Sequence, residues 1–572
     1  MNAFRRKRSR FRDRELNPDE IFLDSSNLPD FDRDRMEGQL EKPLSRFSYL
    51  GLGTAILGLF LVLVVQAGIL EIVKGEAYAA QSERNRLRPE VIFAARGAIT
   101  DRNGTVLASN EPAEEGFPTR IYKYPGFGSV LGYVSYPKKD SSGNYYETEI
   151  TGLAGVEEAF DERLAGVNGT HLVEEDALGT VISEGSIIPV KDGETIALSI
   201  DARAQEAFYG AISELAERIP FQGGAGVLMD VETGEIHALV SYPEYNPNVL
   251  SSGGPHETIE AYQNDYREPY LNRPVAGLYT PGSIVKPMIA AGAYSDGIIS
   301  AEKTITSTGQ LVVPNPYDAS KPTIFRDWKA HGPTTMRQAI AVSSDVYFYT
   351  IGGGFGDQKG LGIERLAYWY RAFGFESPTG IEIAGENTGF VPTPAWKEKT
   401  YDEPWRIGNT YHTAIGQYAM QISVLEAVRA TAAVANGGKL LDVTVQKDGP
   451  VRGETIVIDQ EALRVAREGM RLGVTEGTSV GLAPLSYAKA AGKTGTAQLG
   501  ANNEWYNAWA VGFFPYDKPK YAYAVVMEKG PAGNGVGGIY VMYQVLSELR
   551  QTAPEYFGLE PAHLTASEAP VQ

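Results

Sequence analysis

The chain has 572 residues, more than one ordinary domain holds, so we expect one large core and at least one smaller module. A formal net charge of −19 argues against a nucleic-acid partner, because such partners are bound by neutralising their phosphates. The sequence has no cysteine, which excludes disulfides and thiolate chemistry, and its six histidines form no H-x-x-x-H pair. We therefore predict no metal and no cofactor, and chemistry from hydroxyl, amine and carboxylate groups.

The first element along the chain is an apolar segment over residues 47–70 that contains no charged residue. At about 1.5 Å per residue it is long enough to cross a hydrocarbon core of roughly 30 Å. Residues 1–46 form a mixed-charge tail, and its first fourteen residues include seven Arg or Lys. The positive-inside rule predicts that this tail is cytoplasmic and that the chain after about residue 71 lies outside the membrane.

A cleaved signal peptide is the competing interpretation, since Ala77-Tyr78-Ala79 resembles a small-x-small cleavage site. A signal peptide has a short basic region and a short apolar core, whereas this tail and this apolar segment are both too long. The sequence favours a single-pass anchor in the cytoplasmic (inner) membrane.

Two extracytoplasmic domains are predicted after the anchor. Residues 71–200 are rich in turn residues and alternate apolar and polar side chains in places, which predicts a β-rich pedestal. Residues 201–552 mix both periodicities, and residues 553–572 are predicted to be a loose polar tail. Helices are expected over 201–219, 283–295, 335–350, 421–436, 460–473 and 538–549, and strands within 226–242 and over 508–514 and 521–527. Strands at both ends of this domain predict an α/β sandwich whose sheet is built from distant segments.

Residues 279–286, YTPGSIVK, are the first candidate for chemistry. The Pro-Gly turn predicts that Ser283 lies in the first turn of a helix, with Lys286 on the same face. A serine hydroxyl becomes nucleophilic when a base takes its proton, and a desolvated lysine near other cations can act as that base. The helix N-terminus would also favour the negative charge of a tetrahedral intermediate. Ser-x-x-Lys alone is a weak signal, because most instances combine a capping serine with a solvated lysine.

The second candidate is Ser343-Ser344-Asp345, which falls inside a predicted helix beside the aromatic run 347–349. Serines within helices usually bond their own backbone, so a polar patch on a buried element is the simplest interpretation. In the functional interpretation, Ser343 relays a proton between the lysine and a leaving-group nitrogen.

The third candidate is residues 493–497, KTGTA. Small residues in an edge strand permit the close approach of a ligand backbone. An extended peptide could pair with this strand while Lys493 and the hydroxyls of Thr494 and Thr496 hold its terminal carboxylate. A plain turn with a surface lysine is the alternative.

The order and spacing of the three elements distinguish them from chance matches. Ser-x-x-Lys, a Ser-x-polar element about sixty residues later and Lys-Thr-Gly about 150 residues further on are the signature of penicillin-recognising serine acyltransferases. On these residues the chain resembles a class B penicillin-binding protein over about residues 47–550. Further segments that resemble the family are residues 96–104, 152–157, 166–169, 229–236 and 272–274.

The resemblance implies an α/β transpeptidase fold, with an antiparallel sheet sandwiched by helices, and D,D-transpeptidase activity on peptidoglycan. Ser283 would attack the D-Ala-D-Ala bond of a donor stem peptide, with Lys286 as base and Ser343 as proton relay. The backbone N–H groups of Ser283 and Thr496 would form the oxyanion hole. An amine from a neighbouring stem peptide would then resolve the acyl-enzyme, and β-lactams would acylate the same serine.

The same resemblance assigns the remaining site residues. Asp345 and Lys493 are expected to complete the catalytic set, and the expected substrate-binding residues are Thr494, Gly495 and Thr496.

Two features are similar to penicillin-binding protein 2, the type that acts in cell elongation and shape maintenance. Asp345 stands where division-type relatives usually carry Asn, and residues 392–417 resemble a block of that subfamily, with Asn409 in place of Asp. The segment between Asn110 and Gly152 is much shorter than in those relatives, where it includes a head subdomain. Docking of the scaffold protein MreC, which relatives achieve through that head, therefore stays an open question.

About 130 residues between membrane and catalytic domain could hardly contain a glycosyltransferase. The resemblance therefore implies a SEDS polymerase of the RodA type as partner. The alternatives are a β-lactamase or carboxypeptidase with the same three motifs, a division-type penicillin-binding protein, and a β-lactam sensor or silent scaffold. The membrane anchor and long pedestal favour a synthase over a hydrolase, and the intact motifs favour an enzyme over a scaffold.

Overall fold

The computed structural model describes residues 45–78, 87–112, 116–141, 143–175, 181–315, 318, 320–500 and 502–560. The chain divides into two compact units, residues 1–87 and 88–572. Apart from its last two residues, the predicted cytoplasmic tail lies outside the described residues. Because residues 88–572 form one unit, the expected boundary near residue 200 stays a prediction.

In the first unit, helix α1 (Arg46–Gly68) continues into a π-helical turn, η3 (Ile69–Val73), and none of its residues is buried. The Ser45 side chain caps α1 by accepting a hydrogen bond from the Ser48 N–H group. Within the described ranges this is the one helix that is long and apolar enough to cross a membrane. It contains the whole segment predicted to span the membrane.

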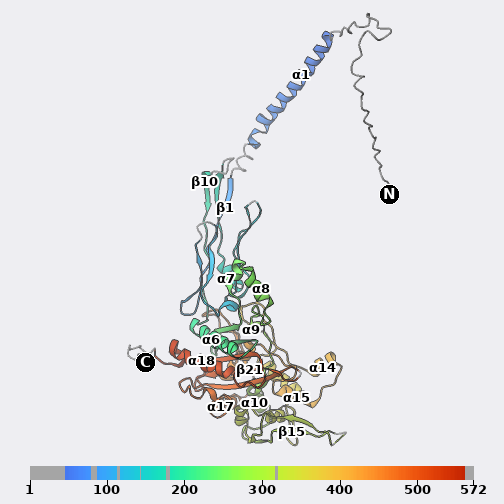
Figure 1. Ribbon diagram of the computed structural model, residues 1–572, viewed down its shortest axis with the longest axis vertical. Helices are drawn as coiled ribbons and strands as arrows, with labels where there is room; N and C mark the ends of the chain where they lie inside the picture. The colour runs from blue at the N-terminus through green and yellow to red at the C-terminus, as the bar shows by residue number, and fades with distance from the viewer. Residues whose placement is uncertain are drawn as a thin grey trace, which may run out of the picture. The chain divides into compact units, whose positions relative to one another are not determined.

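The second unit begins with the pedestal, which is β-rich as predicted (Figure 1). A three-stranded sheet has the order β1-β9-β10, and a four-stranded sheet has the order β11-β2-β3-β4. The longer strands are β1 (Leu87–Ile92), β3 (Val106–Glu111), β4 (Thr119–Tyr122), β9 (Gly169–Glu175) and β10 (Val181–Ile188). The shorter elements are β2 (Ile99–Thr100), β5 (Val134–Ser135), β6 (Lys138–Lys139), β7 (Tyr145–Glu147), β8 (Thr151–Gly152), β11 (Ile196–Ala197), α3 (Gly128–Leu131), α4 (Gly155–Ala159) and α5 (Asp161–Leu164).

The core of the catalytic domain is a five-stranded antiparallel sheet of order β13-β12-β22-β21-β20. Its strands are β12 (Gly223–Asp230), β13 (Ile236–Tyr242), β20 (Ala491–Leu499), β21 (Trp505–Phe514) and β22 (Tyr521–Pro531). The first two strands and the last three come from distant parts of the chain, so the predicted sandwich is confirmed. β20 forms one edge of this sheet.

Helices cover both faces of the sheet (Figure 1). On one face α6 (Ala202–Arg218) packs against α18 (Gly538–Thr552), and on the other lie α10 (Lys286–Ser295), α16 (Val424–Ala435) and α17 (Gln460–Thr475). Each face has its own cluster of buried apolar side chains. Helix α6 follows the predicted pattern closely, with Asp201 as its N-cap and an apolar stripe that is buried.

The remaining elements surround the site described below. Its helices are α7 (Pro247–Ser252), α8 (His256–Asn264), α9 (Arg273–Ala276), α11 (Met336–Val342), α12 (Asp345–Gly353), α13 (Gly362–Ala372), α14 (Pro394–Tyr401) and α15 (Ile407–Ala414). Short strands pair as β14 (Ile305–Ser307) with β17 (Gly332–Thr334), β15 (Gln310–Val313) with β16 (Thr323–Arg326), and β18 (Lys439–Leu441) with β19 (Gly453–Thr455). The 3-10 turns are η4 (Gly282–Val285), η5 (Val480–Leu482) and η6 (Pro554–Phe557).

Two predictions about these elements are wrong. The helix expected over 335–350 is two helices, because Ser343 adopts a left-handed conformation that ends α11, and Ser344 then caps α12. The start of the expected loose tail is also ordered, since Tyr556 is buried and its hydroxyl lies 2.8 Å from Nδ1 of His237. Residues 561–572 lie outside the described residues.

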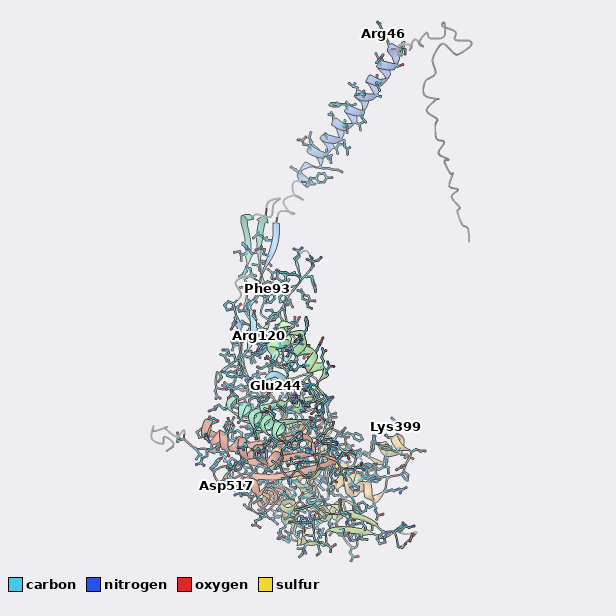
Figure 2. The ribbon with its side chains drawn as sticks, in the orientation of Figure 1. Arg46, Phe93, Arg120, Glu244, Lys399 and Asp517 are labelled. Carbon is cyan, nitrogen blue, oxygen red and sulfur yellow. The ribbon has the colours of Figure 1, made fainter. Side chains whose placement is uncertain are left out.

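Pedestal and catalytic domain are joined by hydrogen bonds between polar side chains and main chain. The Glu244 carboxylate accepts the N–H groups of Gly126, at 2.5 Å, and Gly128, at 2.7 Å. The Gln205 amide donates to the Gly126 carbonyl at 2.6 Å. Figure 2 labels Arg120 in the pedestal and Glu244 nearer the catalytic sheet.

Candidate active site

Ser283 lies in the short 3-10 turn η4, and Lys286 is the first residue of α10, so the predicted helix start is confirmed. The preceding residues are tied down by two hydrogen bonds between the main chains of Tyr279 and Ile422, each of 2.9 Å. The indole N–H of Trp509 also donates to the Thr280 carbonyl at 3.0 Å. Ser283 is half-buried, and its hydroxyl makes no hydrogen bond to any other described residue. The nucleophile candidate is therefore held by its backbone, with its hydroxyl unengaged.

Ser343 owes its position to the break between α11 and α12. Its φ of 59° is rare for a residue other than glycine, and residues held in this way concentrate at functional sites. The break turns the Ser343 hydroxyl toward Lys286 and Lys493 and starts a new helix at Asp345. In one continuous helix the Ser343 carbonyl would accept the N–H group four residues later. The break leaves it free to accept from Lys286, in addition to the hydroxyl.

Asp327, which sequence reasoning missed, fixes the start of α12. Its carboxylate accepts the Ser344 hydroxyl at 2.8 Å, the Val346 N–H at 3.1 Å and the Ser307 hydroxyl at 3.0 Å. Burial raises the pKa of Asp327, but hydrogen bonds to the charged carboxylate outweigh burial, so its pKa is below the ordinary value. A single aspartate in an ordinary loop carried no sequence signal, because its partners become neighbours only in the fold.

Strand β20 carries residues 493–496 along the edge of the sheet, next to the nucleophile turn. A side chain at Gly495 would place its Cβ 2.8 Å from the Pro281 carbonyl oxygen, so glycine is required for this close approach. The small residue thus admits the turn that carries Ser283. The Thr494 hydroxyl lies 2.7 Å from the hydroxyl of Thr478, and Thr496 is exposed.

The two lysines meet at Ser343. The Lys286 ammonium donates to the Ser343 carbonyl at 2.9 Å and to its hydroxyl oxygen at 3.2 Å, and it pairs with Asp345 at 2.6 Å. The Lys493 amine lies 2.8 Å from the same hydroxyl and 2.8 Å from the Thr494 carbonyl. Both lysine residues are 0% exposed, which is rare for this residue type. The three segments found in the sequence therefore converge in one buried cluster.

The electrostatics of this cluster favour a neutral amine. Burial lowers the pKa of Lys493 well below the ordinary lysine value, and the positive charge of Lys286 lowers it further, while the charge of Asp345 opposes both. A neutral Lys493 has a lone pair that can accept the Ser343 O–H proton. The cluster then has an unoccupied proton site, which is what a base requires.

A pocket of about 430 Å³ lies beside the exposed side of β20. It is lined by Thr494, Gly495 and Thr496 from the strand, by Thr478, and by residues 534–539 before and at the start of α18. Its walls offer hydroxyl and main-chain groups along an extended edge, a suitable lining for a peptide in strand conformation. Among the residues that the structure describes, no group of three or more His, Cys, Asp or Glu could hold a metal ion.

Comparisons with known proteins agree with this architecture. Residues 224–545 match the penicillin-binding protein transpeptidase domain, and residues 115–198 match the penicillin-binding protein dimerisation domain. The chain is 30% identical over 593 residues to the peptidoglycan D,D-transpeptidase MrdA of Acinetobacter baumannii, covering 85% of each chain. It is 28% identical to MrdA of Escherichia coli K12, covering 86% of this chain and 93% of that one. FtsI of Escherichia coli K12 is more distant, at 24% identity over 87% of this chain and 90% of its own.

Solved structures give the same picture. Penicillin-binding protein 2 of Pseudomonas aeruginosa shares 30% identity with a TM-score of 0.66, covering 81% of this chain and 96% of its own. The Helicobacter pylori penicillin-binding protein 2, solved in complex with MreC, shares 27% identity with a TM-score of 0.68, covering 82% and 99%. A chain of a peptidoglycan synthase complex shares 27% identity with a TM-score of 0.69, covering 91% and 100%. The chain therefore belongs to the penicillin-binding protein transpeptidase family, as a class B member of the elongation type represented by MrdA, and is a peptidoglycan D,D-transpeptidase.

Proposed function

We propose that Ser283 is the residue acylated during this transpeptidation, and that the buried lysine cluster activates it. The observation that carries the proposal is the pair of fully buried amines on the Ser343 hydroxyl, next to the strand that packs against the Ser283 turn. Burying two lysines together is costly, and it is useful where a neutral amine is required.

In the first step, the Ser283 oxygen attacks the carbonyl carbon between the two terminal D-Ala residues of a donor stem peptide. The Lys286 ammonium first passes a proton through the Ser343 hydroxyl to the neutral amine of Lys493, and the Lys286 amine left behind takes the Ser283 hydroxyl proton. The C–N bond breaks, the leaving nitrogen receives a proton from Ser343, and D-Ala departs. The product is an ester between the stem peptide and Ser283.

Two further groups stabilise the intermediate and orient the donor. Backbone N–H groups of Ser283 and Thr496 form the oxyanion hole, where each donor contributes typically 10²–10³-fold to catalysis. The donor lies extended along β20, with its terminal carboxylate held by Thr494 and Thr496 near the charge of the lysine cluster.

In the second step, the amine of a neighbouring stem peptide attacks the ester carbonyl. The new peptide bond forms, the ester breaks and Ser283 regains its proton. A β-lactam presents a strained amide to the same hydroxyl. Its acyl C–N bond breaks as the ester forms, but the nitrogen stays tethered to the acyl group through the rest of the opened ring, so no leaving group departs and the adduct persists.

The chain is a single-pass membrane protein, and we propose that its N-terminus is cytoplasmic, because the residues before α1 are rich in Arg and Lys. The relatives solved with MreC and within a peptidoglycan synthase complex support an MreC-like scaffold and a glycosyltransferase of the RodA type as partners. The described residues between Asn110 and Gly152 form only short strands and α3, so MreC contacts would use other pedestal surfaces. Co-purification of the chain with each tagged partner tests these two interactions. If the chain is recovered with neither partner, both interactions are refuted.

The proposal is tested by treating the protein with labelled penicillin and locating the added mass by mass spectrometry. We expect a long-lived adduct on the peptide that contains Ser283 and none in Ser283→Ala, which keeps the melting temperature of the wild type. An adduct on another residue, or undiminished labelling of Ser283→Ala, would refute the assignment, and rapid turnover would indicate a β-lactamase or carboxypeptidase. A membrane-impermeant penicillin should label intact cells, and labelling only after lysis would reverse the proposed orientation.

A further inference from the structure

A second pocket, of about 340 Å³, lies beside the nucleophile turn and plays no part in the steps above. Three aromatic side chains and three small or polar residues line it: Phe390, Trp396, Tyr418, Thr280, Ala419 and Gln421. Trp396 comes from α14, the helix on which Figure 2 labels Lys399. The pocket lies within the block of residues 392–417 and the segments next to it, which sequence analysis singled out and the mechanism leaves unused.

The pocket wall is bonded directly to the segment that positions Ser283. Main-chain hydrogen bonds of 2.7 and 3.0 Å join Phe390 and Gln421, and the next residue, Ile422, pairs with Tyr279. The Gly282 N–H donates to the Gly416 carbonyl at 2.8 Å. A ligand in this pocket would therefore contact Thr280, three residues before Ser283, on main chain that is continuous with the turn of Ser283.

The aromatic side chains of the pocket hold one another in place by tilted and edge-to-face contacts. The ring of Trp396 lies 5.0 Å from that of Phe390 and 6.1 Å from that of Tyr418, which in turn lies 5.7 Å from the ring of Trp405. Tyr418 has a φ of 72°, a conformation that side-chain-bearing residues rarely adopt. Such strain persists where the surrounding structure holds it in place, and it is frequent at ligand sites.

The polar groups that line the pocket have no hydrogen-bond partner among the described residues. The Thr280 hydroxyl, the Trp396 indole N–H, the Tyr418 hydroxyl and the Gln421 amide make no hydrogen bond within the described part of the chain. No carboxylate, amine or guanidinium lines the pocket. Its chemistry therefore fits a neutral ligand that has one apolar face and several hydroxyl or amide groups around its rim.

We propose that this pocket binds an N-acetylated sugar of the peptidoglycan glycan strand. A pyranose ring presents a face of C–H groups that stacks on an aromatic ring, and its hydroxyl and acetamido groups match the unpartnered donors and acceptors. The charged carboxylates of stem peptides would find no counter-charge there. A stem peptide spans at most about 3.6 Å per residue, so the sugars that carry the stems stay near the cross-linking site. The inference rests on the proposed acylation of Ser283, because it places the sugar beside that residue.

The test is binding of a stem-free tetrasaccharide of the glycan strand to the full-length protein, measured by isothermal titration calorimetry. We expect saturable binding by the wild type, weakened at least about tenfold in Trp396→Ala and retained in Trp396→Phe, because a flat ring at this position supplies the stacking surface. Tyr266→Ala removes an exposed aromatic side chain outside the pocket and should leave binding unchanged.

Three results would overturn the proposal: no saturable binding by the wild type, equal binding by wild type and Trp396→Ala, or binding of an isolated stem peptide in place of the sugar. If Trp396→Ala lowers the melting temperature, Gln421→Ala decides, because this side chain is exposed and makes no protein hydrogen bond within the described residues. It should weaken tetrasaccharide binding, and wild-type affinity would overturn the proposal. Penicillin labelling of the wild type is measured in parallel, so a failed assignment of Ser283 is distinguishable from a failed sugar site.

Discussion

The pedestal cluster and the active-site cluster each contain a pair of buried basic side chains, but the two pairs have different kinds of partner. In the pedestal, Arg96 and Arg120 both donate to the carboxylate of Glu157, and the side chains of all three are 0% exposed. Further bonds from these guanidinium groups go to main-chain carbonyls, including that of Ile150 at 2.9 Å. In the active-site cluster the buried basic side chains are two lysines, and the group they share is the hydroxyl of Ser343.

The two clusters differ in whether their basic side chains can lose a proton. A guanidinium keeps its proton at any ordinary pH, and carboxylates at Glu157 and Asp161 outweigh the effect of burial and raise the pKa of Arg96 further. A lysine can lose its proton when it is buried, and burial lowers the pKa of Lys493 well below the ordinary lysine value. The first arrangement is suited to holding a structure together, and the second to moving protons.

The largest effect is expected in the pedestal. Glu157→Ala leaves two buried guanidinium groups without their shared carboxylate, and removing one partner of a buried ion pair typically costs about 3–5 kcal/mol. We expect a decrease of that size in the free energy of unfolding, measured by urea denaturation. Glu158→Ala, at an exposed neighbouring position, is the matched control. Equal stability of the two variants would show that the pedestal cluster contributes little.

Lys286→Met tests the catalytic cluster, where we expect the main effect on the acylation rate and not on the free energy of unfolding. The methionine keeps most of the side-chain volume but removes the amine, so acylation by penicillin should slow at least about 10²-fold. The free energy of unfolding should also fall, because the change leaves the Asp345 carboxylate without the amine that pairs with it, but by less than in Glu157→Ala, because the Asp345 side chain is 18% exposed and can be hydrated. Stopped-flow acylation and urea denaturation measure the two quantities. A near-normal acylation rate would point to a different base.

The regular elements could be predicted from the sequence because each depends on its own residues. The strands predicted over 508–514 and 521–527 lie within β21 and β22, and the helix predicted over 460–473 lies within α17. The pedestal was predicted as β-rich from its alternation and its turn residues. Local periodicity is sufficient in such segments.

The geometry of the site could not be predicted in the same way. Ser343 stands in a helical pattern, and its left-handed conformation depends on contacts with side chains that are far away in the sequence. Asp327 and Trp509, which hold the site together, match no motif. The ordered Tyr556 was missed because polar composition nearby indicated a tail, whereas its hydroxyl bonds to His237 on β13. Family resemblance grouped the three motifs, but it did not give the hydrogen bonds that join them.

The pH dependence of acylation tests the neutral amine of the lysine cluster most directly. Asp345 raises the pKa of Lys493, so Asp345→Asn should lower that pKa further and move the rising limb of the acylation rate to lower pH. In the wild type the limb should lie well below pH ~10.4, the ordinary lysine pKa. A limb at that ordinary value, or a shift to higher pH in Asp345→Asn, would contradict the account.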